Sequence, residues 1–237
     1  SQMNQQLRLP IVSLEHTLPI PQLYSPDQLA SMRSMSGDIN VFISDFSKDA
    51  WAVPGVCEVI HHSIDSELFK PMGLYRKPQV LSVANDFVNR DYCLNFYGWQ
   101  RVTEGLTTRL VGDTEGLSKP AESTEKLVEE YNESQIFFNS STLSPVPTSL
   151  LEAMSCGCAV VSTATCMIPE VIKNGVNGFI SNDEGELRGY IEQLLNDEDL
   201  RKKLGDSARQ TVINDFSEKR FINEWNNIFD SAYEELN

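Results

Sequence analysis

Short, continuous apolar runs alternate with longer amphipathic stretches along the chain. Three runs near its start are predicted strands: 10–16, 39–44 and 57–65. Helical patterns lie between them, at 25–35 and from 46 onward, and Ser25 followed by Pro26 is typical of a helix start. This order of strand, helix, strand, helix and strand predicts a parallel sheet with right-handed crossovers.

A second series follows a break at 66–79, whose two prolines, one glycine and three cations predict a linker between domains. The predicted strands of this series are 80–84, 108–113, 135–141, 158–163 and 178–181, and the predicted helices lie near 92–105, near 122–132 and in a segment ending at Cys156. These strands are apolar throughout rather than alternating. Such strands favour a sheet that is covered by helices on both faces.

The last third of the chain is predicted to be helical. Its three segments, 184–197, 198–216 and 217–237, carry apolar residues at positions i, i+3 and i+4. The final segment places Phe221, Trp225, Ile228 and Phe229 on one stripe. We interpret this stripe as core packing rather than a ligand site.

Composition narrows the class of protein. The 237 residues suit one large domain or two small ones, and 41% hydrophobic with 22% charged residues is typical of a globular chain. A net charge of −15 argues against nucleic acid or an anionic membrane surface as a general partner, but it leaves room for a local basic pocket that binds phosphate. No apolar run approaches the ~20 residues of a membrane span.

Five cysteines occur without the spacings of a disulfide framework. Their odd number predicts reduced thiols and a cytoplasmic location. Cys156 and Cys158 could be half of a metal site, but no histidine lies near them in sequence. We interpret them as small buried hydrophobes and predict no metal site.

The segment 144–163 carries the candidate chemistry. It follows the strand 135–141, so the loop 140–148 is expected beyond the carboxyl end of that strand, where doubly wound sheets bind ligands. The start of the next helix offers free amides to a phosphate, with the hydroxyls of Thr148 and Ser149 beside them. Glu152, one turn in, could accept two ribose hydroxyls. The alternative is a capped structural helix whose glutamate reaches solvent.

The wording of 150–180, "LLEAMSCGCAVVSTATCMIPEVIKNGVNGFI", resembles the donor-binding core of retaining glycosyltransferases of family 4, the glycosyl transferases group 1, which have the GT-B fold. The resemblance extends over roughly 10–230, with a variable middle around 91–134. It implies an α/β chain with two Rossmann-like parts: a partial N-terminal domain with its linker at 1–74, and a doubly wound nucleotide-sugar-binding domain at 75–216. A helix at 217–237 would then pack back towards the N-terminal part.

The resemblance assigns roles to individual residues. Glu152 matches the second glutamate of the family's motif, which binds the ribose, whereas Ser144 stands where the first glutamate should contact the donor sugar. Arg90 matches a cation that stabilises the departing diphosphate, and Asn85 replaces a second cation. The alternative for Arg90 is a surface arginine paired with Asp86 or Asp91.

Further positions carry weaker implications. His16 matches a histidine that faces the donor sugar, and its alternative is a satisfied buried histidine. Glu170 matches a glutamate near the donor and could instead favour the start of the following helix. The resemblance also places Gly112 and Pro147 beside the donor. The family's first strands and Gly-rich loop do not precede residue 10. We therefore expect a fragment or a short member, with an exposed sheet edge that another subunit, as in a homo-oligomer, could cover.

The implied activity is transfer of a sugar from a UDP-, GDP- or ADP-sugar to a hydroxyl acceptor, with retention and without a metal or other cofactor. Ser144, Asn85 and the missing N-terminal units favour a second hypothesis, a non-catalytic nucleotide-sugar-binding or assembly module. A third, a sugar-nucleotide epimerase of the same fold, would need further cleft carboxylates and histidines. The sequence leaves the base, the sugar and the acceptor (carbohydrate, lipid or protein) open.

Overall fold

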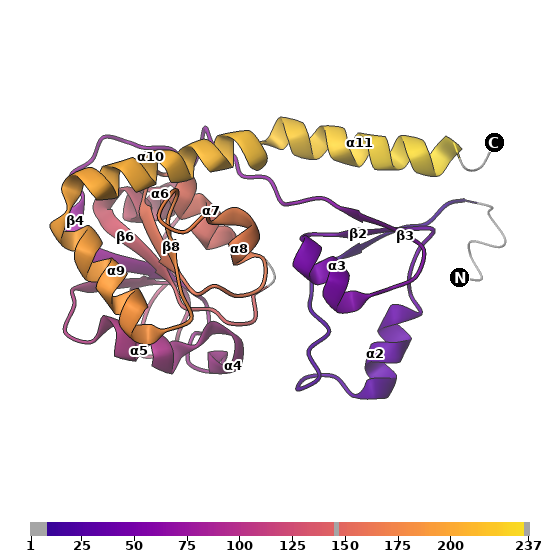
Figure 1. Cartoon of the computed structure of the whole chain (residues 1–237), viewed down its shortest axis with the longest axis horizontal. Helices are drawn as coiled ribbons and strands as arrows, with labels where there is room; N and C mark the ends of the chain where they lie inside the picture. The colour runs from indigo at the N-terminus through magenta and orange to yellow at the C-terminus, as the bar shows by residue number, and fades with distance from the viewer. Residues whose placement is uncertain (1–8, 145–146, 235–237) are drawn as a thin grey trace. The chain divides into compact units, whose positions relative to one another are not determined.

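The structure, a computed structural model, describes residues 9–144 and 147–234. Two compact units are present, and the chain passes between them twice (Figure 1). Unit 1 comprises residues 1–63 and 218–237, and unit 2 comprises residues 64–217. An α/β architecture with parallel sheets is therefore confirmed, in two separate sheets.

Unit 1 is built on a three-stranded parallel sheet in the order β1-β2-β3. Its elements are β1 (Val12–Glu15), α2 (Pro26–Arg33), β2 (Ile39–Phe42), α3 (Asp45–Trp51), β3 (Val56–Val59) and α11 (Glu218–Glu234). Each of α2 and α3 begins with a reciprocal serine cap, at Ser25 and Ser44. The predicted cap at Ser25 is thereby confirmed.

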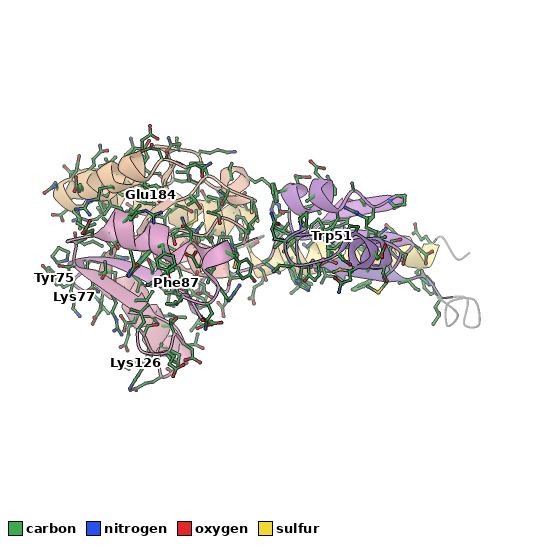
Figure 2. All side chains as sticks on the ribbon, turned by 90° about the horizontal axis from the view of Figure 1, so that it is seen from below. Trp51, Tyr75, Lys77, Phe87, Lys126 and Glu184 are labelled. Atoms are coloured by element: carbon green, nitrogen blue, oxygen red, sulfur yellow. The ribbon has the colours of Figure 1, made fainter. Side chains whose placement is uncertain are left out.

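Helices cover both faces of this sheet, as Figure 1 shows. On one face, Trp51 of α3, which is labelled in Figure 2, packs with Leu29 and Phe42. Its indole N–H donates to the carbonyl of Thr17 at 2.9 Å. On the other face, the stripe of α11 packs on Val41 and Ile60 through Phe221, Trp225 and Ile228. This part of the stripe is core packing, as predicted, whereas Phe229 is 54% exposed.

Unit 2 contains a five-stranded parallel sheet in the order β5-β4-β6-β7-β8. The strands are β4 (Lys77–Val83), β5 (Thr108–Val111), β6 (Ser134–Asn139), β7 (Ala159–Ser162) and β8 (Phe179–Ile180). The helices are α4 (Asp91–Leu94), α5 (Phe96–Thr103), α6 (Thr124–Glu133), α7 (Thr148–Ser155), α8 (Ile168–Val171), α9 (Glu184–Asn196) and α10 (Glu198–Asp215). β4 begins at Lys77, inside the segment predicted as linker.

Two apolar layers enclose this sheet. One layer joins the strands to α6, α7, α8 and α10, and the other joins them to α5 and α9. Phe87, which is labelled in Figure 2, lies in the second layer. Its ring is edge-on to that of Phe96, with 5.2 Å between ring centroids. The centre of β4 and most of β6 and β7 are therefore buried, as predicted for strands that helices cover on both faces, whereas β5 exposes Thr108 and Arg109.

The unit boundary lies between 63 and 64, whereas sequence reasoning placed a boundary between 74 and 75. The physical reason is that the segment 64–76 hydrogen-bonds to α6 and α7, and so belongs with the rest of unit 2. The Met72 amide donates to Asn132 Oδ1 at 2.8 Å, and the Ser155 hydroxyl donates to the Phe69 carbonyl at 2.6 Å. The final helix groups with unit 1.

Candidate functional site

A cavity of about 260 Å³ lies beyond the carboxyl ends of β4 and β6, against the start of α7. Residues that are distant in sequence meet there because both strands run in the same direction and end at the same edge of the sheet. Seven residues singled out from the sequence line it: Asn85, Arg90, Ser144, Pro147, Thr148, Ser149 and Glu152. Arg90 is the one cation and Glu152 the one acid among the described lining residues.

The guanidinium of Arg90 is exposed and makes no hydrogen bond or ion pair within the described part of the chain. The carboxylates that could have paired with it are engaged elsewhere. Asp86 accepts from the Asn89 side chain at 2.6 Å, and Asp91 accepts from the Tyr97 amide at 3.0 Å. The surface ion pair considered for Arg90 is therefore absent from the described residues, and its charge is available to an anion in the cavity.

The loop that follows β6 is held by hydrogen bonds that it donates to carbonyls of α4. The Ser140 hydroxyl donates to the Leu94 carbonyl at 2.8 Å, and the Thr142 amide donates to the Cys93 carbonyl at 2.8 Å. Arg90 immediately precedes α4 as its N-cap residue. The helix α4 therefore fixes the backbone of Arg90 relative to the loop that leads to α7.

The start of α7 is open to a ligand. Its N-cap residue, Pro147, supplies no side-chain cap. Within 9–144 and 147–234, the amides of Thr148 and Ser149 make no hydrogen bond, and the Ser149 hydroxyl is 3.5 Å from the Val83 carbonyl, at the limit of a hydrogen bond. Free N–H groups and the helix dipole make this end favourable for negative charge.

Glu152 lies one turn into α7 and is half-buried. Its Oε2 accepts a hydrogen bond from the Tyr131 hydroxyl at 2.7 Å. Burial raises the pKa of Glu152, and the hydrogen bond from Tyr131 acts in the opposite direction. The glutamate is thus held at the cavity wall rather than extended into solvent. Because Pro147 provides no side-chain cap, the alternative of a capped structural helix does not describe this segment.

Gly112 does not line the cavity. It lies behind Asn85, where its backbone has a φ of +131° and any Cβ would lie only 2.0 Å from the Ala84 carbonyl oxygen, so a side chain is excluded. Asn85 Oδ1 accepts from the Asp113 amide at 2.8 Å and ties the ends of β4 and β5 together. Gly112 therefore supports the wall of the cavity, because its lack of a side chain lets its backbone lie against the Ala84 carbonyl next to Asn85.

Two other predicted residues lie away from the cavity. Glu170 is in the first turn of α8 and is not a lining residue. His16 belongs to unit 1, where it is exposed and stacks on His62 with 5.9 Å between ring centroids, so the buried-histidine alternative is wrong. Its role towards a donor sugar stays a prediction.

Sequence reasoning missed Tyr131, the partner of Glu152, and Asn139 at the end of β6. Asn139 donates to the Ser162 hydroxyl at 2.9 Å and accepts from the Ser141 hydroxyl at 2.9 Å. A signal for Tyr131 existed, because a tyrosine on the apolar face of a helix needs a hydrogen-bond partner for its hydroxyl. Nothing in the sequence identified that partner.

The cysteines form no disulfide and, in the part of the chain that the structure describes, no metal-binding cluster. All five cysteines are free, and Cys156 and Cys158 are fully buried, as predicted. No cluster of three or more His, Cys, Asp or Glu side chains that could hold a metal ion occurs within the described ranges. In the same ranges, no helix has the length and apolar character to cross a membrane.

With this geometry established, comparison with known proteins identifies one part of the chain. Residues 119–211 match the family model described as Glycosyl transferases group 1. This segment contains α6, β6, α7, β7 and most of the cavity wall that carries Glu152.

A curated relative, N-acetyl-alpha-D-glucosaminyl L-malate synthase of Bacillus anthracis, is 35% identical over 83 residues, which are 34% of this chain and 22% of the relative. The chain thus matches less than a quarter of that protein's length.

Two solved structures share the fold over nearly the whole chain. Sucrose-phosphate synthase from Thermosynechococcus elongatus has a TM-score of 0.83 at 16% identity, covering 99% of this chain and 70% of that one. HepE from Anabaena in complex with UDP has a TM-score of 0.80 at 17% identity, covering 96% and 74%. The chain therefore has the fold of GT-B glycosyltransferases, with two Rossmann-like sheets.

Proposed function

We propose that this chain is part of a retaining glycosyltransferase of family 4 and carries its nucleotide-sugar site. The observation that carries the proposal is the cavity that joins the guanidinium of Arg90, the open start of α7 and the half-buried carboxylate of Glu152. A cation with helix amides suits a diphosphate, and a carboxylate suits a ribose diol. The match of 119–211 to glycosyl transferases group 1 supports this assignment.

The residues of the cavity have two tasks in the proposed reaction, to stabilise the leaving group and to hold the nucleoside. Transfer breaks the bond between the sugar and the diphosphate and forms a bond between the sugar and the oxygen of the acceptor hydroxyl, whose proton ends on the departing diphosphate or in water. Negative charge grows on the leaving diphosphate oxygen. Arg90 and the amides of Thr148 and Ser149 stabilise that charge without a bound metal. Glu152 fixes the nucleoside, so that binding energy away from the reacting bond positions the sugar.

A uridine nucleotide is the donor we propose to test first, because a structural neighbour was solved in complex with UDP. The experiment is a thermal-shift panel of UDP, GDP and ADP with their glucose conjugates. A nucleotide at about 100 times its Kd should add about 2.7 kcal/mol to the free energy of unfolding. Glu152→Ala should erase this gain, measured against the variant's own unliganded melting temperature, which should fall because the buried Tyr131 hydroxyl loses its partner. Equal nucleotide shifts in the variant would refute the proposed site.

The non-catalytic module remains a second candidate, and Ser144 is the observation that favours it. Ser144 lines the cavity at the position where the family has its first glutamate. A module would bind UDP-glucose without releasing UDP, because it would transfer the glucose neither to water nor to an added acceptor. If Ser144→Glu gains UDP release that the parent chain lacks, the parent is a binding module; if the parent already releases UDP and transfers glucose, it is an enzyme.

A further inference from the structure

Tyr131 is a buried polar residue in an otherwise apolar setting. It has 0% of its surface exposed and lies on α6, with its ring 6.2 Å from that of Phe69 and 5.9 Å from that of Phe137. A phenol buried among aromatic rings loses its hydration, so its hydroxyl must find a partner within the protein. The partner here is the carboxylate of Glu152 on the neighbouring helix.

The hydrogen bond uses only one side of that carboxylate. Tyr131 donates to Oε2 at 2.7 Å, whereas Oε1 has no hydrogen bond within the described residues. Glu152 also lines the cavity. A carboxylate held through one oxygen cannot rotate freely, and its second oxygen keeps lone pairs for a ligand.

Electrostatics give the pair a defined protonation state. Burial and the adjacent carboxylate raise the pKa of Tyr131 well above its ordinary value, so the phenol keeps its proton and acts as the donor. Cys156 and Cys158 face the same phenol, and burial raises the pKa of both thiols. Arg76 and Arg209 lie around Cys156.

For Glu152 itself, burial is the dominant influence and raises its pKa, while the hydrogen bond from Tyr131 is the influence that lowers it. The tyrosine therefore favours the ionised carboxylate, which is the form that accepts hydroxyl hydrogen bonds through both oxygens.

We infer that Tyr131 is a positioning residue: its hydroxyl fixes Oε2 of Glu152 so that Oε1 is presented to the ribose of the bound nucleotide. This inference rests on the proposed function, because it assumes that Glu152 binds the ribose. Tyr131 itself does not line the cavity, so it acts only through the glutamate.

The test measures the Kd of UDP from pH 5 to pH 8.5 by titration calorimetry on the 237-residue chain. Four proteins are compared: the parent chain, Tyr131→Phe, Glu152→Gln and Ser155→Ala. Ser155 is the matched control, because its buried hydroxyl lies on the same helix but donates to the Phe69 carbonyl and not to Glu152.

Tyr131→Phe should weaken UDP binding about tenfold at neutral pH, since it removes a hydrogen bond to a charged group. It should also move the acid limb of binding to higher pH, because Glu152 then protonates more easily. Ser155→Ala should leave the Kd and the acid limb unchanged. A merely structural tyrosine would not move the acid limb.

The outcomes separate the two proposals. If Glu152→Gln binds UDP as tightly as the parent, the proposed site fails and Tyr131 has nothing to position. If Glu152→Gln binds weakly but Tyr131→Phe keeps the parent Kd and acid limb, the positioning role is wrong and the site stands.

Should Tyr131→Phe not fold, proton NMR of the parent chain decides the question. A slowly exchanging Tyr131 hydroxyl proton that shifts as Glu152 titrates supports the inference. A hydroxyl proton that exchanges at the solvent rate overturns it.

Discussion

The guanidinium of Arg76 donates to the carbonyl oxygen of Cys156 at 2.6 Å, at the end of α7. Its other terminal nitrogen donates to the carbonyls of Tyr131 and Ser134 at 2.9 Å each, at the end of α6. One side chain therefore satisfies carbonyls at the carboxyl ends of both helices, where intrahelical donors are lacking. This sets the spacing of the helices that carry Tyr131 and Glu152.

Replacing Arg76 by lysine should lower the free energy of unfolding of unit 2 by about 1–3 kcal/mol, because an ammonium cannot reach all three carbonyls and leaves buried acceptors unsatisfied. Urea denaturation followed by circular dichroism measures this loss. Arg101→Lys is the control, since Arg101 forms an exposed pair with Glu184. An unchanged midpoint for Arg76→Lys would show that the guanidinium fork is dispensable.

Removing the charge of Arg90 should weaken UDP binding roughly tenfold and leave the melting temperature of the free protein unchanged. The reason is that Arg90 has no partner among the described side chains to lose. The loss should shrink at high salt, where exposed charges are screened. Titration calorimetry of Arg90→Ala at two ionic strengths tests this, with Lys126→Ala as the control because Lys126 points away from the unit (Figure 2). Equal binding by Arg90→Ala would remove this arginine from the site.

Gly112→Ala should destabilise unit 2 by about 1–3 kcal/mol, because its Cβ would meet the Ala84 carbonyl and its backbone has positive φ. Gly189 provides the opposite control: it is exposed within α9 and a Cβ there meets nothing within 4 Å. Gly189→Ala should stabilise the helix by about 0.5–1 kcal/mol. Thermal unfolding of both variants gives the comparison. A Gly112→Ala variant as stable as the parent would contradict the close contact between Gly112 and the Ala84 carbonyl.

Acidification should destabilise unit 1 through His62. Burial lowers its pKa below the ordinary 6.5, and the neighbouring His16 and His61 lower it further. The folded state therefore binds the proton less readily than the unfolded chain, so this contribution to stability is present above about pH 6.5 and is lost as the pH falls below it.

Fluorescence can isolate this effect, because Trp51 and Trp225 are in unit 1 and Trp99 is the third tryptophan. Urea titrations of a Trp99→Phe background between pH 5 and pH 8 should show the loss, and His62→Asn should flatten it. A slope that persists in His62→Asn would assign it to another group.

The alternation of apolar and amphipathic segments predicted most of the strands and helices, because period and composition are local properties. The start of β4 at Lys77 was missed, since lysine and proline at 77–78 do not resemble a buried strand and only pairing with Ser134 defines it. The two-residue β8 and the single-turn helices α4 and α8 are set by tertiary contacts rather than propensity.

In the candidate site, too, only features that are local in the sequence could be predicted. The helix start and Glu152 could be predicted because they are contiguous in sequence. The partnership of Glu152 with Tyr131 spans 21 positions and two helices, so no local pattern reveals it. The pairing of Asn85 with the Asp113 amide was likewise out of reach, because it depends on the register between β4 and β5.

The chain enters unit 2 at residue 64 and leaves it at 217, so unit 1 is assembled from two distant segments. During ribosomal synthesis, the whole of unit 2 emerges before the helix that covers Val41 and Ile60 exists. The early strands must then wait, with one apolar face bare, until residues 218–234 have been translated. A nascent chain stalled before 218 should accordingly hold a folded unit 2, while the strands of unit 1 are still recognised by chaperones and proteases.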